Sequence, residues 1–255
     1  MDRLYSSGLT TKAFAKDGFV QLRGFNDRDE RDELVSRLEA FLKEQVPKLP
    51  EEHVFHEKKG ERSTLKQVQQ LGQHDSWFFK LANSGRFRQT AEQLLGGPVV
   101  PKNLQYFDKP PLVSRPTPAH QDGHYFMIEP CEAVTMWLAI DDADEENGCV
   151  HYVKGSHLLG LREHQRTSTL GFSQGISDYP TARDLENVTP LLARAGDLLV
   201  HDARTIHLAS RNSSTTRSRR ALGFIYYSAQ AREDKRAHAA YQLRLASDLK
   251  AEGRL

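Results

Sequence analysis

The sequence predicts a mainly β fold with helical additions (α+β). We expect a double-stranded β-helix, or jelly-roll, core of the cupin-like kind, with N-terminal helices packed on one sheet. From residue 99 onward, short runs rich in β-branched and aromatic residues are separated by Pro, Gly, Asn and Asp, as in antiparallel barrels. Helical patterns are confined to the first third and the C-terminal end. No linker or internal repeat divides the 255 residues.

We therefore expect one domain over residues 1–255. It would contain a helical part over about 1–97, a jelly-roll core over about 98–230 and a C-terminal helix over about 231–252.

The first predicted elements are a short helix and a strand. Thr10 or Thr11 is a suitable N-cap for a helix that runs through Lys16, and Gly18 is a suitable residue to end it. The run 18–25 (GFVQLRGF) then alternates between apolar and polar residues, which predicts a strand.

Two longer helices are predicted before residue 98. Asn26 or Asp27 caps the first, roughly 27–46, and Pro47 and Pro50 end it. Its apolar face consists of Leu34, Leu38, Phe41 and Leu42. Residues 50–72 are polar and are expected to form loops with one strand. The run 84–97 has a serine cap and a glycine exit, which predicts the second helix.

The remainder of the chain is expected to consist of short strands followed by one helix. The predicted strands are 103–109, 124–128, 133–142, 149–155, 196–202 and 219–229. The helical run 231–249 presents Tyr241, Leu243, Leu245 and Leu249. These side chains would pack either on the barrel or on a second subunit, so a homodimer is one alternative.

Composition and charge exclude several classes of protein. Hydrophobic residues make up 38% and charged residues 27%, which favours a packed core over disorder. A formal net charge of +1 gives no bulk attraction to nucleic acid or membrane. We find no apolar run long enough to span a bilayer and no signal peptide. Cys131 and Cys149 are too few for a disulfide scaffold, so we expect reduced cysteines and a cytoplasmic protein.

The stretch 118-PAHQDGHYF-126 indicates a metal site. In a strand, alternate side chains share a face, so His120 and Asp122 would point the same way. A third ligand must come from elsewhere, and the run 196-GDLLVHDARTIHLASRN-212 offers His207 or His201. His124 is a further alternative.

Two histidines and one carboxylate suit an iron(II) ion that keeps three positions open, which a 2-oxo acid and O2 can occupy. Structural zinc normally has four protein ligands and often uses cysteine. A 2-oxo diacid also needs a cation for its distal carboxylate. The run 217-RSRRALGFIYY-227 supplies Arg217, Arg219 and Arg220, although a solvated basic loop is an alternative interpretation.

Taken together, these segments resemble the phytanoyl-CoA dioxygenase-like family of iron(II)/2-oxoglutarate oxygenases. The resemblance covers most of the chain and is carried by an ordered set of motifs. They are AFAKDGFVQLRGF, DKPP, HQDGHYF, VTMWLAIDDADEENGCVHYVKGSH, GDLLVHDARTIHLASRN and RRAL.

The resemblance implies a jelly roll with iron(II) held by His120, Asp122 and His207, whereas His201 falls where an aromatic residue usually lies. It assigns the distal carboxylate of 2-oxoglutarate to Arg219. Arg217 remains an alternative, because this chain has one extra residue before the arginine. A serine that often contacts the co-substrate is replaced by Ala209, with Ser210 next to it.

The resemblance also implies residues around the co-substrate. Thr135, Trp137 and Gln105 are expected to line the 2-oxoglutarate pocket, with core packing as the alternative for Trp137. Residues that could contact a small-molecule substrate are His124, Tyr125, His151 and Arg211. For the two histidines, a buried hydrogen-bonded role is the alternative.

The expected function is hydroxylation of an unactivated C–H bond of a small molecule, with O2 consumed and 2-oxoglutarate converted to succinate and CO2. Related halogenases have a small residue at the carboxylate position, so Asp122 favours hydroxylation. The alternative is a cupin-like metal-binding protein or enzyme that does not use 2-oxoglutarate.

Overall fold

Two antiparallel sheets form the centre of the molecule. The computed structural model describes residues 7–58, 60–169 and 172–251. The larger sheet has the order β1 (Phe19–Leu22), β12 (Leu198–Asp202), β7 (Ala133–Ala139), β14 (Ala221–Ser228), β4 (Val99–Phe107), β3 (Leu65–Val68) and β2 (Val54–His56). The smaller has the order β11 (Val188–Leu191), β8 (Val150–Val153), β13 (His207–Ala209) and β5 (Thr117–His120). This confirms the predicted jelly-roll core.

Two short strand pairs extend this core, β9 (His164–Thr169) with β10 (Phe172–Ile176) and β6 (Ile128–Glu129) with β15 (Arg232–Glu233). The described helices are α1 (Ser7–Asp17), α2 (Arg28–Glu44), α3 (Leu71–His74), α4 (Ser76–Asn83), α5 (Gly85–Leu95), α6 (Asp122–Phe126), α7 (Ala182–Asn187) and α8 (Lys235–Ala251). Short 3-10 turns are η1 (Val46–Lys48), η2 (Glu51–His53), η3 (Arg62–Thr64) and η4 (Ser156–Leu159).

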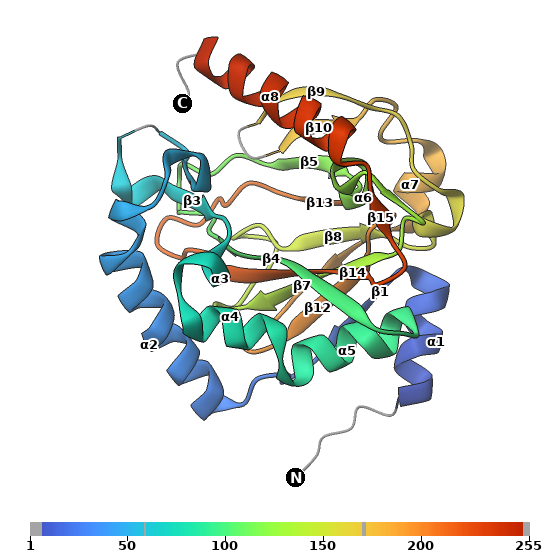
Figure 1. Cartoon of the computed structure of the whole chain (residues 1–255), viewed down its shortest axis with the longest axis horizontal. Coiled ribbons are helices and arrows are strands. Elements are labelled where there is room, and N and C mark those ends of the chain that lie inside the picture. The colour runs from blue at the N-terminus through green and yellow to red at the C-terminus, as the bar shows by residue number, and fades with distance from the viewer. Residues whose placement is uncertain (1–6, 59, 170–171, 252–255) are drawn as a thin grey trace.

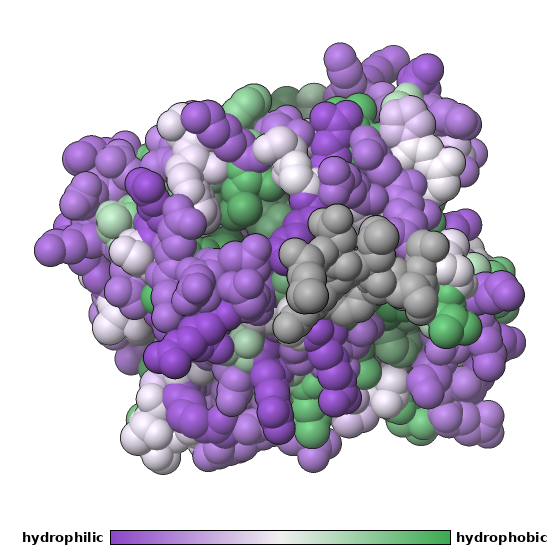
Figure 2. Space-filling model, turned by 90° about the horizontal axis from the view of Figure 1, so that it is seen from below, coloured by the Kyte–Doolittle hydropathy of each residue, from purple (hydrophilic) through white to green (hydrophobic). Residues whose placement is uncertain are grey.

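The N-terminal helices cover the outer face of the larger sheet, as predicted (Figure 1). On β14, Leu222, Phe224 and Tyr226 point to the helices and belong to the largest apolar cluster. Phe224 stacks on Phe87 of α5 with ring centroids 4.1 Å apart. The intervening residues of β14 face the other sheet, because side chains alternate along a strand. The same sheet therefore has a helix-packed face and an interior face. Seen from the helical side, the molecular surface is mostly hydrophilic (Figure 2).

The predicted helix ends are partly correct. Gly18 follows α1 with φ +84°, and a Cβ there would lie 2.5 Å from His157 Nδ1, so this position requires glycine. Asp27 caps α2 in a reciprocal capping box with Glu30. Ser84 precedes α5 without a side-chain cap, because its hydroxyl donates to the Lys80 carbonyl.

Other local predictions were wrong. Helix α1 begins before the predicted threonine caps. Residues 50–72 contain two strands, β2 and β3, and α4 follows unpredicted. The predicted strand 124–128 is instead mostly the helix α6.

Three other observations bear on the predictions. Among the described residues, no helix is both long and apolar enough to cross a membrane. Cys131 and Cys149 are both free, and they pack in different apolar clusters. On α8, Tyr241 packs against Tyr125 with ring centroids 6.2 Å apart, while Leu243 is 73% exposed. The side chains of Leu245 and Leu249 lie outside the described ones.

Candidate metal centre

Three predicted ligands meet in the interior of the jelly roll. His120 ends β5 and His207 begins the neighbouring strand β13, where the two residues are register partners. Asp122 is the first residue of α6. One ligand atom from each of the three side chains lies within 4.8 Å of the other two. In the described parts of the chain, this is the group of His, Cys, Asp and Glu side chains that could hold a metal ion.

The reason that His120 and Asp122 point the same way differs from the predicted one. They do not share a strand, because β5 ends at His120 and α6 begins at Asp122. Gln121 between them nevertheless has extended backbone angles, φ −125° and ψ 127°. One extended residue is sufficient to place its two neighbours on the same side. His124 follows inside the helix, so it does not continue the ligand face as a strand residue would.

Backbone carbonyls orient both histidine rings. His120 Nδ1 lies 2.8 Å from the Pro118 carbonyl, and His207 Nδ1 lies 3.1 Å from the Thr205 carbonyl. Because a carbonyl only accepts, each Nδ1 carries the proton and donates it. Nε2 of His120 and of His207 is then directed to Asp122 Oδ1, at 3.6 and 3.7 Å. Such a carbonyl–histidine arrangement is typical of metal-binding imidazoles.

The protonation states also suit a metal. Burial lowers the pKa of His120 and lowers that of His207 well below its usual range, so both rings are neutral. Burial opposes the charge of Asp122, but the hydrogen bond from His201 lowers the pKa of this carboxyl. Neutral imidazole and carboxylate are the forms that ligate metals.

The second oxygen of Asp122 is occupied by hydrogen bonds. Thr135 Oγ1 donates to Oδ2 at 2.5 Å, and His201 Nε2 lies 3.1 Å from the same atom. The structure therefore places Thr135, predicted for the co-substrate pocket, on the ligand carboxylate. His201, the rival ligand, lies beside the three predicted ligands and contacts one of them.

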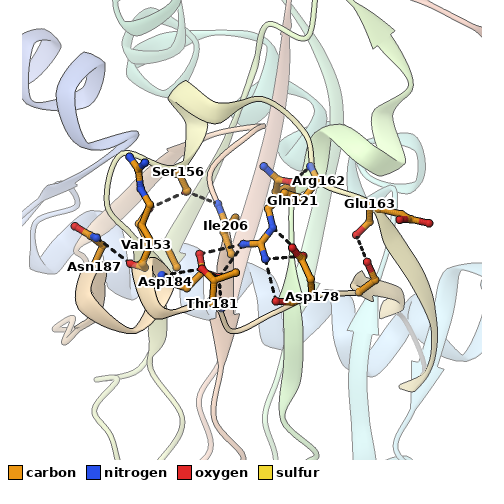
Figure 3. Close-up of polar contacts among 12 residues, drawn as sticks. Gln121, Val153, Ser156, Arg162, Glu163, Asp178, Thr181, Asp184, Asn187 and Ile206 are labelled. Atoms are coloured by element: carbon orange, nitrogen blue, oxygen red, sulfur yellow. Dashed lines mark hydrogen bonds and ion pairs between the residues drawn. The ribbon is translucent and has the colours of Figure 1, made fainter.

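A polar network surrounds Gln121, the residue between His120 and Asp122 (Figure 3). The buried Gln121 side chain donates to the carbonyls of Gly160 and Arg204 at 2.8 and 2.6 Å, and accepts from the Arg162 N–H at 2.8 Å. The Arg162 guanidinium in turn pairs with Asp178 and Asp184. The network also secures the third ligand, because Ser156 Oγ accepts from the backbone N–H of Ile206, which precedes His207. No sequence pattern indicated these roles.

Arg219 lies at the other end of this interior and is 5% exposed. It donates to the Gly148 carbonyl at 3.1 Å and lies over the Trp137 ring, with Cζ 5.0 Å from the centroid. Its Nε is buried without a hydrogen-bond partner among the described residues. Burial lowers its pKa to about 10, so it stays charged. A buried cation with an unused donor is suited to bind an anion.

Trp137 and Thr135 share a face of β7 and are two residues apart, or about 7 Å along the strand. Gln105 lies in the same row as Trp137, because both pair with Gly223 of β14. The Gln105 side chain accepts from Gln67 Nε2 at 3.0 Å. Thus Arg219, Trp137 and Gln105 gather at one end, and the three predicted ligands lie beyond Thr135.

The other arginines lie elsewhere. Arg217 pairs on the surface with Asp144 at 2.8 Å and with Glu146. Arg211 is exposed. Two buried lysines lie in this region, Lys109 beside Arg219 and Lys66 beside Lys109. Burial, followed by the charges of Arg219 and Lys66, lowers the pKa of Lys109 well below its usual range.

The other three predicted substrate residues lie in different places. Tyr125 lies beside the centre, with its ring 6.0 Å from that of His120 and its hydroxyl donating to the Gln174 carbonyl at 2.8 Å. His124 stacks on His164 at 4.1 Å, and burial lowers its pKa to about 4. His151 faces away from the interior, because its neighbour Tyr152 on β8 points inward.

A jelly roll with two histidines, one carboxylate and a buried arginine defines the class of iron- and 2-oxoglutarate-dependent oxygenases. The residues fit both groups, since the ligand set suits iron and Arg219 has an unused donor for a carboxylate. The chain belongs to the phytanoyl-CoA dioxygenase family, because the family model described as Phytanoyl-CoA dioxygenase (PhyH) matches residues 14–221.

Individual relatives have low sequence identity to this chain. Phytanoyl-CoA dioxygenase 1 of Oryza sativa subsp. japonica is 32% identical over 126 residues, which is 49% of this chain and 43% of that protein. Phytanoyl-CoA dioxygenase domain-containing protein 1 of Rattus norvegicus is 28% identical over 84% of this chain and 87% of that protein. The fold is shared with the epimerase SnoN, solved with Fe3+, alpha ketoglutarate and nogalamycin RO. Its TM-score is 0.71 at 24% identity, over 89% of this chain and 85% of that one.

Proposed function

We propose that this protein is a dioxygenase that hydroxylates an unactivated C–H bond of a small molecule. In the overall reaction one oxygen atom of O2 enters the C–H bond. The other enters succinate, as 2-oxoglutarate loses CO2. The observation that carries the proposal is the pairing of the His120–Asp122–His207 ligand set with the partnerless Nε of Arg219 across one interior.

Iron(II), when bound, would supply the activation of O2 that is coupled to the decarboxylation of 2-oxoglutarate. His120, Asp122 and His207 would hold it on one side and leave the opposite side open. Arg219 would bind the distal carboxylate, with Trp137 beneath the guanidinium. Asp122 fills a ligand position, which favours hydroxylation over transfer of a halide.

The interior around these residues also limits water. Tyr152, Phe19 and Leu199 form an apolar cluster with Trp137 between the two sheets. An enclosed site of low polarity strengthens the ion pair between Arg219 and a carboxylate. Tyr125 and Tyr241 pack together on the side of His120 that faces α8, where a substrate would enter past aromatic rings.

The test is an anaerobic titration of metal-free protein with iron(II) and then 2-oxoglutarate, followed by the visible metal-to-ligand charge-transfer band. We expect a band in the wild type and none in His207→Ala. In Arg219→Gln, the concentration of 2-oxoglutarate needed for half-saturation should rise about 10- to 100-fold, because a charge-assisted contact is lost.

Arg217→Gln is the matched control and should titrate like the wild type, since Arg217 pairs on the surface. A protein that binds iron(II) tightly yet never shows the band would contradict the use of 2-oxoglutarate. It would favour a cupin-like metal protein instead. Undiminished hydroxylation by Asp122→Ala would contradict the ligand set.

A further inference from the structure

His201 is buried in the interior, yet the proposed ligand set does not use it. It lies on β12, where the sheet register places it between Phe19 of β1 and Thr135 of β7. It is 3% exposed, and its ring is 4.2 Å from that of His207. A polar side chain buried this completely beside a charged carboxylate requires a hydrogen-bonding role.

Both ring nitrogens of His201 have such a role. Nε2 lies 3.1 Å from Asp122 Oδ2, and Nδ1 lies 3.0 Å from the Tyr152 hydroxyl. A carboxylate only accepts, so Nε2 carries the proton and donates it to Asp122. Nδ1 must then accept from the Tyr152 O–H. Tyr152 is itself fully buried and stacks on Phe19 at 4.7 Å, so this donor is held in place.

The two oxygens of Asp122 therefore have different surroundings. Oδ2 takes hydrogen bonds from Thr135 and His201. Oδ1 faces Nε2 of His120 and of His207 and is the atom left for a metal. Without the two donors, rotation of the carboxylate could exchange its oxygens or present both.

We infer that His201, held in one tautomer by Tyr152, is a positioning residue that directs Asp122 to ligate through Oδ1 alone. The inference rests on the proposed function, because it requires a metal at the three ligands. As a consequence, Asp122 would contribute one oxygen atom to the metal, beside Nε2 of His120 and of His207. Groups that orient metal ligands typically change metal affinity about 10- to 100-fold when they are removed.

The experiment measures Mn(II) binding to metal-free protein, with free Mn(II) followed by its electron paramagnetic resonance signal, so the readout does not depend on turnover. His201→Phe keeps a ring of similar volume but removes both hydrogen bonds. We expect its dissociation constant for Mn(II) to rise about 10- to 100-fold. His201→Gln keeps an N–H donor near the position of Nε2, and we expect it to recover most of the affinity.

Tyr152→Phe removes only the hydroxyl that selects the tautomer. We expect about three- to tenfold weaker Mn(II) binding, and this variant keeps the question decidable should His201→Phe fail to fold. His151→Phe is the matched control, a His-to-Phe change on the outward face of the neighbouring strand β8, and should bind Mn(II) like the wild type.

The outcomes separate the two proposals. Wild-type affinity in His201→Phe and Tyr152→Phe would overturn the positioning role while leaving the metal centre intact. Loss in His201→Gln as large as in His201→Phe would also overturn it, because the imidazole itself would then be required. Wild-type protein that binds neither Mn(II) nor iron(II) would overturn the proposed function and this inference with it.

Discussion

Among individual residues, the few buried polar atoms without a partner are informative. In the described chain these are Gln67 Oε1, Asp108 Oδ1, His157 Nδ1 and Arg219 Nε. An unsatisfied buried group costs stability. For Arg219, we propose that the distal carboxylate of 2-oxoglutarate satisfies this atom. Asp108 lies in the same region, and its negative charge favours the charged form of the Arg219 guanidinium.

Asp108 gives a prediction for pH. Burial raises its pKa to about 6, although Arg219 opposes the shift. The folded protein therefore holds this proton more tightly than the unfolded chain. The neutral Asp108 carboxyl therefore favours the folded state at a pH below the pKa that this group has in the unfolded chain. This contribution to the free energy of unfolding is lost as pH rises through the folded pKa of about 6. Asp108→Asn removes the charge and should increase the free energy of unfolding by up to about 3 kcal/mol at pH 8.

At pH 4 the same substitution should have little effect, since the native carboxyl is already protonated. Denaturant unfolding of both proteins at the two pH values is the measurement. An equal effect at pH 4 and pH 8 would contradict a raised pKa for Asp108.

At the scale of elements, the corner between β5 and α6 sets the ligand geometry. Helix α6 is short, and the backbone N–H of Gly123 donates to the Ala203 carbonyl at 2.8 Å. A Cβ at Gly123 would lie 2.6 Å from Cys131 Sγ, so a larger residue in this corner would require the Cys131 side chain to move. Gln121 joins this corner to the loop after η4 (Figure 3).

Gln121→Leu should therefore weaken both the fold and the centre. It leaves the carbonyls of Gly160 and Arg204 and the Arg162 N–H without their partner, at a cost of roughly 3 kcal/mol. The apparent dissociation constant for Mn(II) should rise as well, because the backbone between His120 and Asp122 loses its anchor. Thermal unfolding and the Mn(II) titration measure the two effects.

Gln73→Leu, an exposed change on α3, is the control. Unchanged metal binding in Gln121→Leu would show that the corner holds without this network.

At the scale of the whole molecule, the larger sheet separates stability from chemistry. Its outer face packs on α1, α2, α4 and α5 (Figure 1). Its inner face carries Thr135, Trp137 and His201. The apolar cluster under the helices is the largest in the described chain. Substitutions on the two faces should consequently have different effects.

Phe224→Ala tests this separation. Phe224 is fully buried on the helical face, so its truncation should cost about 4 kcal/mol and lower Tm by roughly 10 °C. The Mn(II) dissociation constant of the folded variant should stay within about twofold of the wild type, because distant sites are nearly independent. Calorimetry and the Mn(II) titration give the two values. A large loss of metal affinity at a temperature where the variant is folded would contradict the separation of stability from metal binding.

The sequence alone determined the fold class, because period-two strands with turn residues between them recur from residue 99 onward. It also supplied the ligand candidates, since His-x-Asp and a later histidine are visible as residue types. The residue pattern by itself did not decide between His201 and His207, which lie six residues apart on β12 and β13, whereas the family resemblance favoured His207. That choice depends on strand register, which pairs His207 with His120 and His201 with Thr135.

Only the tertiary structure decided the remaining roles. Local propensity suggested a strand after Asp122, whereas the chain forms the helix α6 there, which removes His124 from the face that His120 and Asp122 share. The face of His151 follows from its neighbour Tyr152. Arg219 is buried in the interior, whereas Arg217, two residues earlier, is partly exposed and pairs with Asp144. Hydrogen-bond partners far apart in the chain, such as Tyr152, His201 and Asp122, have no local signature. They are brought together by packing, which a linear pattern does not contain.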